Sequence, residues 1–273
     1  MAYKMIVTDL DDTLLDDQRL ISDENVTALK TANAMGIEIV LASGRADQSM
    51  RPYIDYLAEH MSVNYYISFN GALIKNFKEE IIFEQILQGK VLRQLIDLGK
   101  SYDITTQLYW NNQLICDQYD ERVKSYEQLT DTKAIIVDNL QSVPGTAKCL
   151  FNSVDKAKLE ALQDRIREMI QSGEIDEDLT FFFSKDTYLE VLNKNADKGK
   201  AMLFLAERLG IAQNEIIAAG DSFNDESMIT MAGMGVVPRN GKEDIKAKAD
   251  HISVCTNNEH IMNYILENFI CSR

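Results

Sequence analysis

Short apolar runs alternate with helical segments at both ends of the chain, and this alternation constrains the fold more than any other feature. The almost continuous apolar run Ile37–Ala42 is typical of a strand buried on both faces. A helix that begins at a Ser22 cap and ends near Gly36 precedes this run, and further strands are predicted at Tyr3–Thr8 and Tyr65–Phe69. This pattern predicts an α/β fold in which helices cover both faces of a doubly wound parallel sheet.

The pattern changes near Glu84, and the α/β alternation returns only after residue 187. Short strand-like pieces separate the helical segments of this middle region, and the pair Asn111-Asn112 is a plausible hairpin turn between two of them. A length of 273 residues also suggests about two domains. We therefore predict a core formed by residues 1–84 and 188–273, with an α+β domain inserted at residues 85–187. The helices of the insertion are expected near residues 89–102, 119–131 and 155–171.

Charge and composition limit the partners of the chain. A formal net charge of −15 disfavours nucleic acid and anionic membranes, since both are bound through Lys and Arg. No apolar stretch approaches the roughly 20 residues that span a bilayer, and the N-terminus runs into a strand without a signal-like apolar block, which favours the cytoplasm. The four widely spaced cysteines indicate reduced thiols. A small or metal-bound ligand fits these properties best.

Four polar clusters stand where a predicted core strand ends or a core helix begins. In open parallel sheets the carboxyl ends of the strands form the crevice that binds ligands, so the fold can bring these clusters together. Each cluster alone is more simply explained as a turn, a helix cap or a solvated charge. Their combination makes a functional site the better explanation. The clusters are Asp9-Leu10-Asp11-Asp12-Thr13, Ser43-Gly44-Arg45, Lys198-Gly199 and Gly220–Asp225.

The chemistry of these clusters suits a metal ion and a phosphate group. Asp9 and Asp221 at neighbouring strand ends would repel each other, and a few hard oxygen ligands point to Mg²⁺, which shares its coordination shell with a substrate phosphate. Ser43 offers a hydroxyl, Gly44 leaves its backbone N–H open to close approach, and Lys198 adds a positive charge at a helix N-terminus.

In this order, the clusters resemble the haloacid dehalogenase-like (HAD) superfamily of phosphohydrolases. The stretches "LASGR", "FNGALI", "YLEVLNKNADKGKAM" and "AAGDSFNDESMI" are similar to its Cof-type branch, subclass IIB, whose large α+β cap is inserted between the second and third motifs. The resemblance covers the two core segments nearly completely, and it covers the cap mainly by position and size. It implies a Rossmann-like, HAD-like core with a cap of the C2B type.

The resemblance also implies roles for the acids. Asp9 would be the nucleophile that forms an aspartyl-phosphate, and Asp11 would protonate the leaving alcohol and then activate water. Mg²⁺ would be held by the Asp9 carboxylate, the Asp11 backbone carbonyl and Asp221, with Asp225 supporting the shell. The acidic segment Asp9–Asp12 would thus place a nucleophile, an acid/base and a metal ligand close together.

The phosphoryl oxygens would be held by Ser43, Gly44, Lys198 and Asn224, where positioning and charge supply most of the catalysis. The resemblance therefore implies an Mg²⁺-dependent phosphatase for small phosphomonoesters, with sugar phosphates or phosphorylated cofactors as substrates. A phosphomutase of the same fold and a slow-turnover phospho-acceptor remain alternatives. Monomer and homodimer both stay open.

Two stretches depart from the family pattern. Asp12 stands where the family often has glycine, and we expect its side chain to point away from the site. Pro238 and Arg239 replace smaller residues after the fourth motif, so Arg239 is a candidate for altering the rim of the pocket. Asn240 is expected to cap the next helix.

Overall fold

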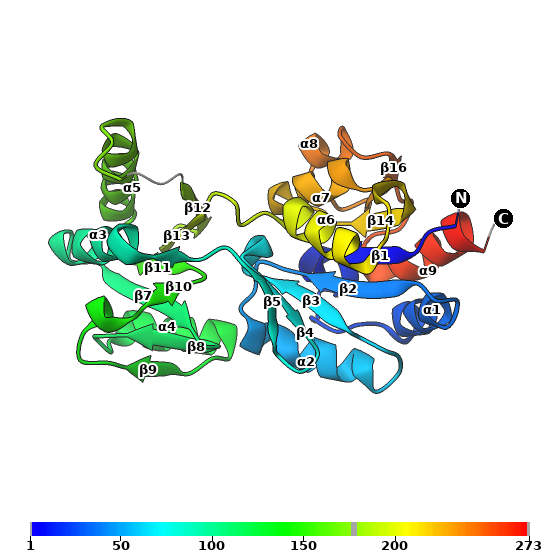
Figure 1. Ribbon diagram of the computed structural model, residues 1–273, viewed down its shortest axis with the longest axis horizontal. Coiled ribbons are helices and arrows are strands. Elements are labelled where there is room, and N and C mark those ends of the chain that lie inside the picture. Colours follow the sequence, from blue (N-terminus) through cyan, green and yellow to red (C-terminus); the bar gives the residue numbers. More distant parts are fainter. Residues whose placement is uncertain (1, 176–178, 272–273) are drawn as a thin grey trace. The chain divides into compact units, whose positions relative to one another are not determined.

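The computed structural model describes residues 2–175 and 179–271. Its contacts divide the chain into two compact units (Figure 1). The first unit, called the core, comprises Met1–Arg45, Met50–Phe83 and Asp197–Arg273, and the second, called the cap, comprises Ala46–Ser49 and Glu84–Ala196. Within the described ranges, no helix combines the length and the apolar character that crossing a membrane requires.

The core contains an eight-stranded sheet in the order β16-β15-β14-β1-β2-β3-β4-β5. Neighbouring strands from β16 to β3 are parallel, and β4 returns antiparallel to β3. The predicted parallel α/β core is therefore confirmed. The strands are β1 (Met5–Thr8), β2 (Glu38–Ala42), β3 (Tyr65–Ser68), β4 (Leu73–Asn76), β5 (Ile81–Glu84), β14 (Ile216–Ala219), β15 (Met234–Val237) and β16 (His251–Ile252).

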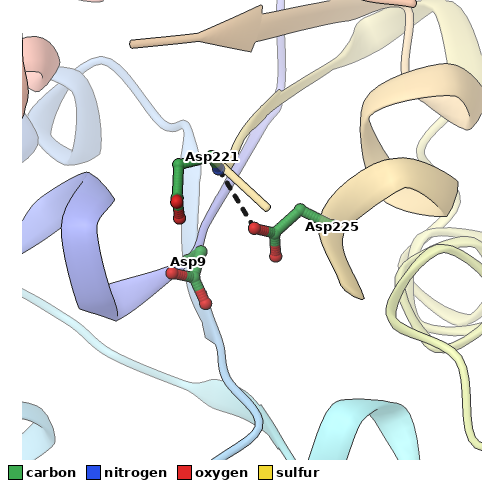
Figure 2. A group of neighbouring side chains, drawn as sticks. All are labelled: Asp9, Asp221 and Asp225. Carbon is green, nitrogen blue, oxygen red and sulfur yellow. Dashed lines mark hydrogen bonds between the residues drawn. The ribbon is translucent and has the colours of Figure 1, made fainter. Parts of the chain in front are cut away.

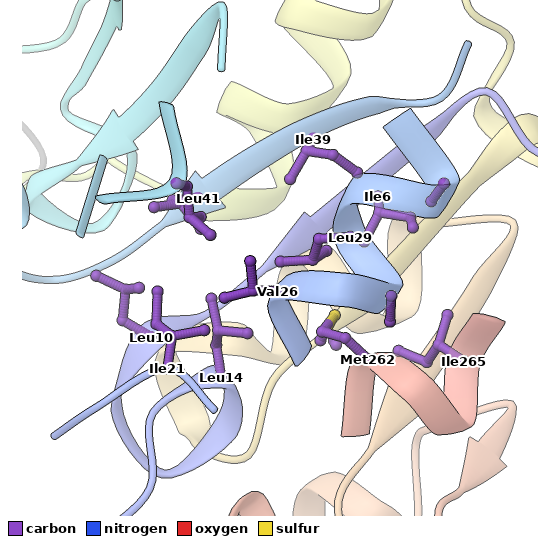
Figure 3. Close-up of a cluster of buried hydrophobic side chains, with 14 of the residues drawn as sticks. Ile6, Leu10, Leu14, Ile21, Val26, Leu29, Ile39, Leu41, Met262 and Ile265 are labelled. Carbon is purple, nitrogen blue, oxygen red and sulfur yellow. The ribbon is translucent and has the colours of Figure 1, made fainter. Parts of the chain in front are cut away.

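Helices pack on both faces of this sheet because its central strands are apolar on both sides. In β2, Ile39 and Leu41 join one hydrophobic cluster with α1, α2 and α9 (Figure 3), whereas Val40 and Ala42 join another with α6, α7 and α8. The sheet is thus doubly wound. The helices are α1 (Asp23–Ala34), α2 (Asp47–Ala58), α6 (Lys198–Leu209), α7 (Glu226–Met231), α8 (Glu243–Lys246) and α9 (Ile261–Ile265).

The cap is built on a six-stranded sheet in the order β12-β13-β11-β7-β8-β9, beside a two-stranded pair of β10 and β6. Helices α3 and α5 bury their apolar sides against the larger sheet, in a cluster separate from the two clusters of the core. The elements are β6 (Leu87–Gln88), α3 (Gly89–Ser101), β7 (Thr105–Trp110), β8 (Gln113–Cys116), α4 (Glu121–Thr130), β9 (Ala134–Ile136), β10 (Gly145–Thr146), β11 (Cys149–Asn152), α5 (Lys156–Gln171), β12 (Leu179–Lys185) and β13 (Tyr188–Asn193).

The predicted hairpin turn of the cap is present. Trp110 pairs with Gln113 across the antiparallel strands β7 and β8, which leaves Asn111 and Asn112 as a two-residue loop. Both asparagines have positive φ angles, 50° and 61°. Tight two-residue hairpins need such angles, and asparagine adopts them more easily than most residues.

The boundary predicted at residue 188 is wrong. β13 pairs with β11 and β12, so it is a strand of the cap sheet, and the core resumes only at Asp197. The core assignment of "YLEVLN" rests on the core motifs in the stretch that follows it. Its periodicity does not distinguish a strand of one sheet from a strand of the other.

Candidate active site

The order of the core strands brings three of the predicted clusters to one edge of the sheet. β1 lies between β14 and β2, and both neighbours run parallel to it, with Thr8 beside Ala219 and Leu41. Parallel strands end at the same edge, so the residues that follow these three strands meet there. Asp9, Ser43 and Asp221 occupy these positions, although they are far apart in the sequence.

Three carboxylates gather at this edge. Asp9, Asp221 and Asp225 each offer an oxygen, and these oxygens all lie within 4.8 Å of one another (Figure 2). The three residues are only 5%, 7% and 0% exposed. Carboxylates this close and this buried repel one another strongly unless positive charge compensates them.

Lys198 supplies part of that charge. Its ammonium group donates to Asp9 Oδ1 at 2.5 Å and to Asp225 Oδ1 at 2.6 Å, and its side chain is fully buried. It is the first residue of α6, a helix that the side chain of Asp197 caps through the N–H of Lys200. Burial by itself lowers the pKa of Lys198, but the charges of Asp225 and Asp9 outweigh this effect and raise it, so the amine remains charged.

Asp225 shapes the site as well as adding charge to it. While its Oδ1 accepts from Lys198, its Oδ2 accepts the backbone N–H groups of Asp221 and Ser222, both at 3.0 Å. These bonds fix the loop that presents the Asp221 carboxylate. Asp221 Oδ1 in turn accepts a hydrogen bond from Thr13 at 3.3 Å.

Negative charge still exceeds positive charge in this cluster, and the pKa values show the consequence. Burial, followed by the charge of Asp225, raises the pKa of Asp9 well above the ordinary aspartate value despite Lys198. The same two causes, with the charge of Asp12, raise the pKa of Asp221 to about 7. One lysine facing three buried carboxylates leaves a donor set of hard oxygens that fits a divalent cation such as Mg²⁺.

Asp11 stands apart from the three carboxylates. Its side chain pairs with Arg45, whose Nε and Nη2 donate to Asp11 Oδ2 and Oδ1 at 2.8 and 2.6 Å. Asp11, the predicted acid/base, therefore lies two residues from Asp9 in the sequence, but its carboxylate contacts Arg45.

The Ser43-Gly44 loop is held against the loop that follows β3. The N–H of Asn70 donates to the carbonyl of Ser43 at 3.0 Å, and a Cβ added to Gly44 would lie 2.8 Å from Asn70 Oδ1. That same Oδ1 accepts from Asn224 Nδ2 at 3.0 Å. Ser43, Gly44 and Asn224, three of the predicted phosphate-binding residues, are thus connected through Asn70. Phe69 and Asn70 both adopt positive φ, at 49° and 55°, which is strained for non-glycine residues.

The departures from the family pattern have local explanations. Asp12 has a φ of 56°, an angle that favours glycine, and its carbonyl accepts from Asn240 Nδ2 at 2.8 Å. Asp12 is exposed, yet its charge contributes to the raised pKa of Asp221. The predicted capping role of Asn240 is wrong, because Lys242 is the N-cap residue of α8. Arg239 pairs with Glu259 at 2.8 Å.

Two residues of the site escaped the sequence analysis. Arg45 and Asn70 lie in the stretches "LASGR" and "FNGALI", and the sequence predicts no pairing for either. Both directly adjoin predicted site residues or strand ends, and this adjacency was the available signal. Their partners Asp11 and Asn224 lie 34 and 154 positions away, so no local pattern connects them.

Comparisons with known proteins show which family the chain resembles along its length. The family model described as haloacid dehalogenase-like hydrolase matches residues 6–265. The phosphatase YwpJ of Bacillus subtilis is 27% identical, with 98% of this chain and all of the relative covered. The 5-amino-6-(5-phospho-D-ribitylamino)uracil phosphatase YcsE of the same organism is also 27% identical, over 92% of this chain and 89% of its own. A crystal structure of a haloacid dehalogenase-like hydrolase from Bacteroides thetaiotaomicron superposes with a TM-score of 0.85 at 30% identity, covering 97% and 98% of the two chains.

Proposed function

The chain belongs to the haloacid dehalogenase-like hydrolase family, and from this premise we propose that it is an Mg²⁺-dependent phosphatase acting on small-molecule phosphomonoesters. The observation that carries the proposal is the buried group of Asp9, Asp221 and Asp225 around Lys198 at the carboxyl ends of parallel strands. Repulsion within such a group lowers the stability of the fold, so a structural role does not explain it. The group suits a reaction that brings a cation and a phosphate together.

The reaction has two steps. In the first, an Asp9 carboxylate oxygen bonds to phosphorus, the bond from phosphorus to the leaving oxygen breaks, and Asp11 gives its proton to that oxygen. In the second, water bonds to phosphorus and gives a proton to Asp11, while the bond from phosphorus to Asp9 breaks. The products are an alcohol and inorganic phosphate, and both aspartates return to their starting states.

Asp9, the backbone carbonyl of Asp11 and Asp221 would hold the Mg²⁺, and Asp225 supports them through its bonds to the Asp221 loop and to Lys198. When bound, the ion supplies positive charge that neutralises the carboxylates and the phosphoryl oxygens. The raised pKa values of Asp9 and Asp221 support this assignment, because both reflect a shortage of positive charge.

Lys198 serves both the nucleophile and the substrate in this proposal. An ammonium group has three N–H donors, and Asp9 and Asp225 take two of them. The third is left for a phosphoryl oxygen, together with the Ser43 hydroxyl, the Gly44 N–H and the Asn224 amide. The hydrogen bond between Asn70 and Asn224 keeps the last of these groups in place.

The substrate class is a small phosphomonoester, either a sugar phosphate or a phosphorylated cofactor. The name of the relative YcsE supports this size range, since it describes a phosphorylated ribityl compound. The net charge of −15 also disfavours phosphorylated nucleic acid or membrane lipid as the substrate.

The test is phosphate release from a panel of sugar phosphates, phosphorylated cofactors and p-nitrophenyl phosphate, with Mg²⁺ or with EDTA. Wild type and Asp9→Asn are compared, with Asp244→Asn as a matched control because this aspartate is exposed on α8. We expect release that requires both Mg²⁺ and Asp9 and is unchanged in Asp244→Asn. Labelling of Asp9 without phosphate release would instead favour a phosphomutase or a slow phospho-acceptor.

A further inference from the structure

Arg45 engages both oxygens of the Asp11 carboxylate. Nε donates to Oδ2 at 2.8 Å and Nη2 to Oδ1 at 2.6 Å, which is the two-pronged geometry in which a guanidinium binds a carboxylate most specifically. Of the Asp11 side chain, 50% is exposed, against 19% of the Arg45 side chain. The more exposed partner is therefore held by the more buried one.

Arg45 is itself fixed by its surroundings. Its guanidinium carbon lies 5.0 Å from the centroid of the Tyr53 ring, and Nη1 donates to the Tyr53 hydroxyl at 3.3 Å. Its backbone N–H donates to Ser43 Oγ at 3.1 Å. The arginine is thus part of the same loop as the predicted phosphate-binding hydroxyl, and a helix residue restrains its far end.

The backbone does not hold the Asp11 side chain in the same way. Asp11 has extended φ and ψ angles of −69° and 134°, between the end of β1 and the left-handed Asp12. Half-exposed aspartates on such irregular segments have several rotamers open to them. The contact with Arg45 is what selects one of them.

This contact has a chemical consequence for a residue that must both give and take a proton. An ionised carboxylate accepts from both prongs of the guanidinium, whereas a carboxylic acid carries hydrogen on one oxygen and accepts from one prong only. In the observed pair Arg45 engages both oxygens of Asp11, so one contact has to open before an oxygen can carry the proton that Asp11 donates. Donating a proton to a leaving group requires that one oxygen turn away from Arg45.

Resting on the proposed phosphatase activity, we propose that Arg45 is a positioning residue for Asp11. It holds the Asp11 side chain by both oxygens in the observed structure, and in the reaction it would hold one oxygen while the other faces the leaving group. Tyr53 assists by orienting the guanidinium. Arg45 acts through Asp11 in this proposal, so it affects only those steps that need a proton from Asp11.

Substrates that differ in their leaving group separate this role from a structural one. An alkyl phosphate needs a proton on its leaving oxygen, whereas p-nitrophenolate is a stable anion that leaves without one. The ratio kcat/KM reports the steps up to the aspartyl-phosphate, so it isolates the proton donation. A residue that acts through the acid should therefore matter for kcat/KM of the alkyl phosphate and little for that of the aryl phosphate.

The experiment measures kcat/KM for p-nitrophenyl phosphate and for the alkyl phosphate that wild type hydrolyses fastest. For Arg45→Ala we expect a fall of about 100-fold on the alkyl phosphate and less than about 5-fold on p-nitrophenyl phosphate. Arg45→Lys keeps the charge without the fork and should lie between wild type and Arg45→Ala. Tyr53→Phe should show a loss of a few-fold with the same substrate dependence.

Arg51→Ala is the matched control. Arg51 also lies in the core, pairs with Asp55 at 2.6 Å and stacks over the Phe77 ring at 4.7 Å, so it makes the same kinds of contact without touching a predicted site residue. Its removal should leave both kcat/KM values unchanged. Thermal unfolding checks that each variant folds. If Arg45→Ala does not fold, the substrate dependence of Arg45→Lys and Tyr53→Phe tests the role of Arg45.

Equal losses on the two substrates would overturn the role of Arg45 and leave the phosphatase standing. Wild type that releases phosphate from neither substrate would overturn the phosphatase and this inference with it.

Discussion

Each of the two units buries a lysine against carboxylates, and the two arrangements differ in their charge balance. In the cap, Lys148 pairs with Glu190 at 3.1 Å and lies 5.4 Å from the centroid of the Tyr109 ring. In the core, Lys198 contacts Asp9 and Asp225 while Asp221 lies among the same carboxylates. The cap pair is neutral, whereas the core group carries excess negative charge.

The pKa values reflect this difference. Burial lowers the pKa of Lys148, but Glu190 more than offsets this effect, so the amine remains charged. In the core, Lys198 does not prevent the pKa values of Asp9 and Asp221 from rising. A buried lysine and glutamate that balance each other need no further charge. An excess of buried carboxylates needs a bound cation to compensate it. We infer that the first kind serves the fold and the second serves the chemistry.

Replacing an acid by its amide should therefore have opposite effects on the stability of the two units, and Asp221→Asn gives the largest expected change. In the core, this variant should lower phosphate release by about 10³-fold, because the proposed metal ligand is lost. It should also raise the free energy of unfolding in EDTA at pH 7.5 by about 1 kcal/mol, since a repelled charge is removed. Steady-state assays and urea unfolding measure the two effects. A clear loss of metal-free stability would contradict the charge-imbalance explanation.

The same change in the cap should destabilise the protein. Glu190→Gln leaves Lys148 buried without its counter-charge, and breaking a buried pair from one side costs about 3 kcal/mol. The double variant Lys148→Met/Glu190→Leu removes both charges and should recover most of that loss. Urea unfolding of the single and double variants measures it. If the single variant were as stable as wild type, the cap pair would not be a structural element.

The dependence of stability on pH gives a third test. The pKa of Asp221 is about 7 in the folded protein against 3.8 for the ordinary side chain, so the folded state binds this proton more tightly. Its contribution to stability is fully present below the lower value and is lost as the pH rises through the higher one. In EDTA, wild type should therefore lose stability between about pH 4 and pH 7 relative to Asp221→Asn.

Mg²⁺ should reverse this loss if it binds the ionised carboxylates of the folded state, as we propose. At roughly 30 times its Kd it should add about 2 kcal/mol at pH 7.5, and much less at pH 5, where protons compete. Thermal unfolding with Mg²⁺ and with EDTA at the two pH values measures the difference. A stabilisation that is equal at both, or that persists in Asp221→Asn, would place the metal elsewhere.

Gly44→Ala should have the smallest effect. The added methyl group would lie 2.8 Å from Asn70 Oδ1, which must shift and disturb its bond with Asn224. We expect phosphate release to fall by about 10-fold, equivalent to roughly 1.4 kcal/mol in the barrier, with the free energy of unfolding changed by less. Steady-state assays of Gly44→Ala, Asn70→Ala and the double variant measure the coupling. Fully additive losses would show that the two residues act independently.

Local sequence patterns predicted well those elements whose conformation depends on their own residues. The run at Ile37–Ala42 indicated a strand buried on both faces, and β2 does pack against a helical layer on each side. The pair Asn111-Asn112 indicated a tight turn because few residues accept positive φ. The sequence-based prediction places β13 in the wrong unit, because strand periodicity carries no information about which sheet a strand joins.

For the site, the sequence by itself determined which residue types follow each core strand, and so it indicated acids, a hydroxyl, a glycine and a lysine at one sheet edge. Only the tertiary structure decided how these groups pair. It placed Lys198 between Asp9 and Asp225, turned Asp11 to Arg45 and connected Asn224 to Asn70. The physical reason is range: propensity and periodicity act over a few neighbouring residues, whereas a buried ion pair forms between side chains that meet only after the sheet has assembled.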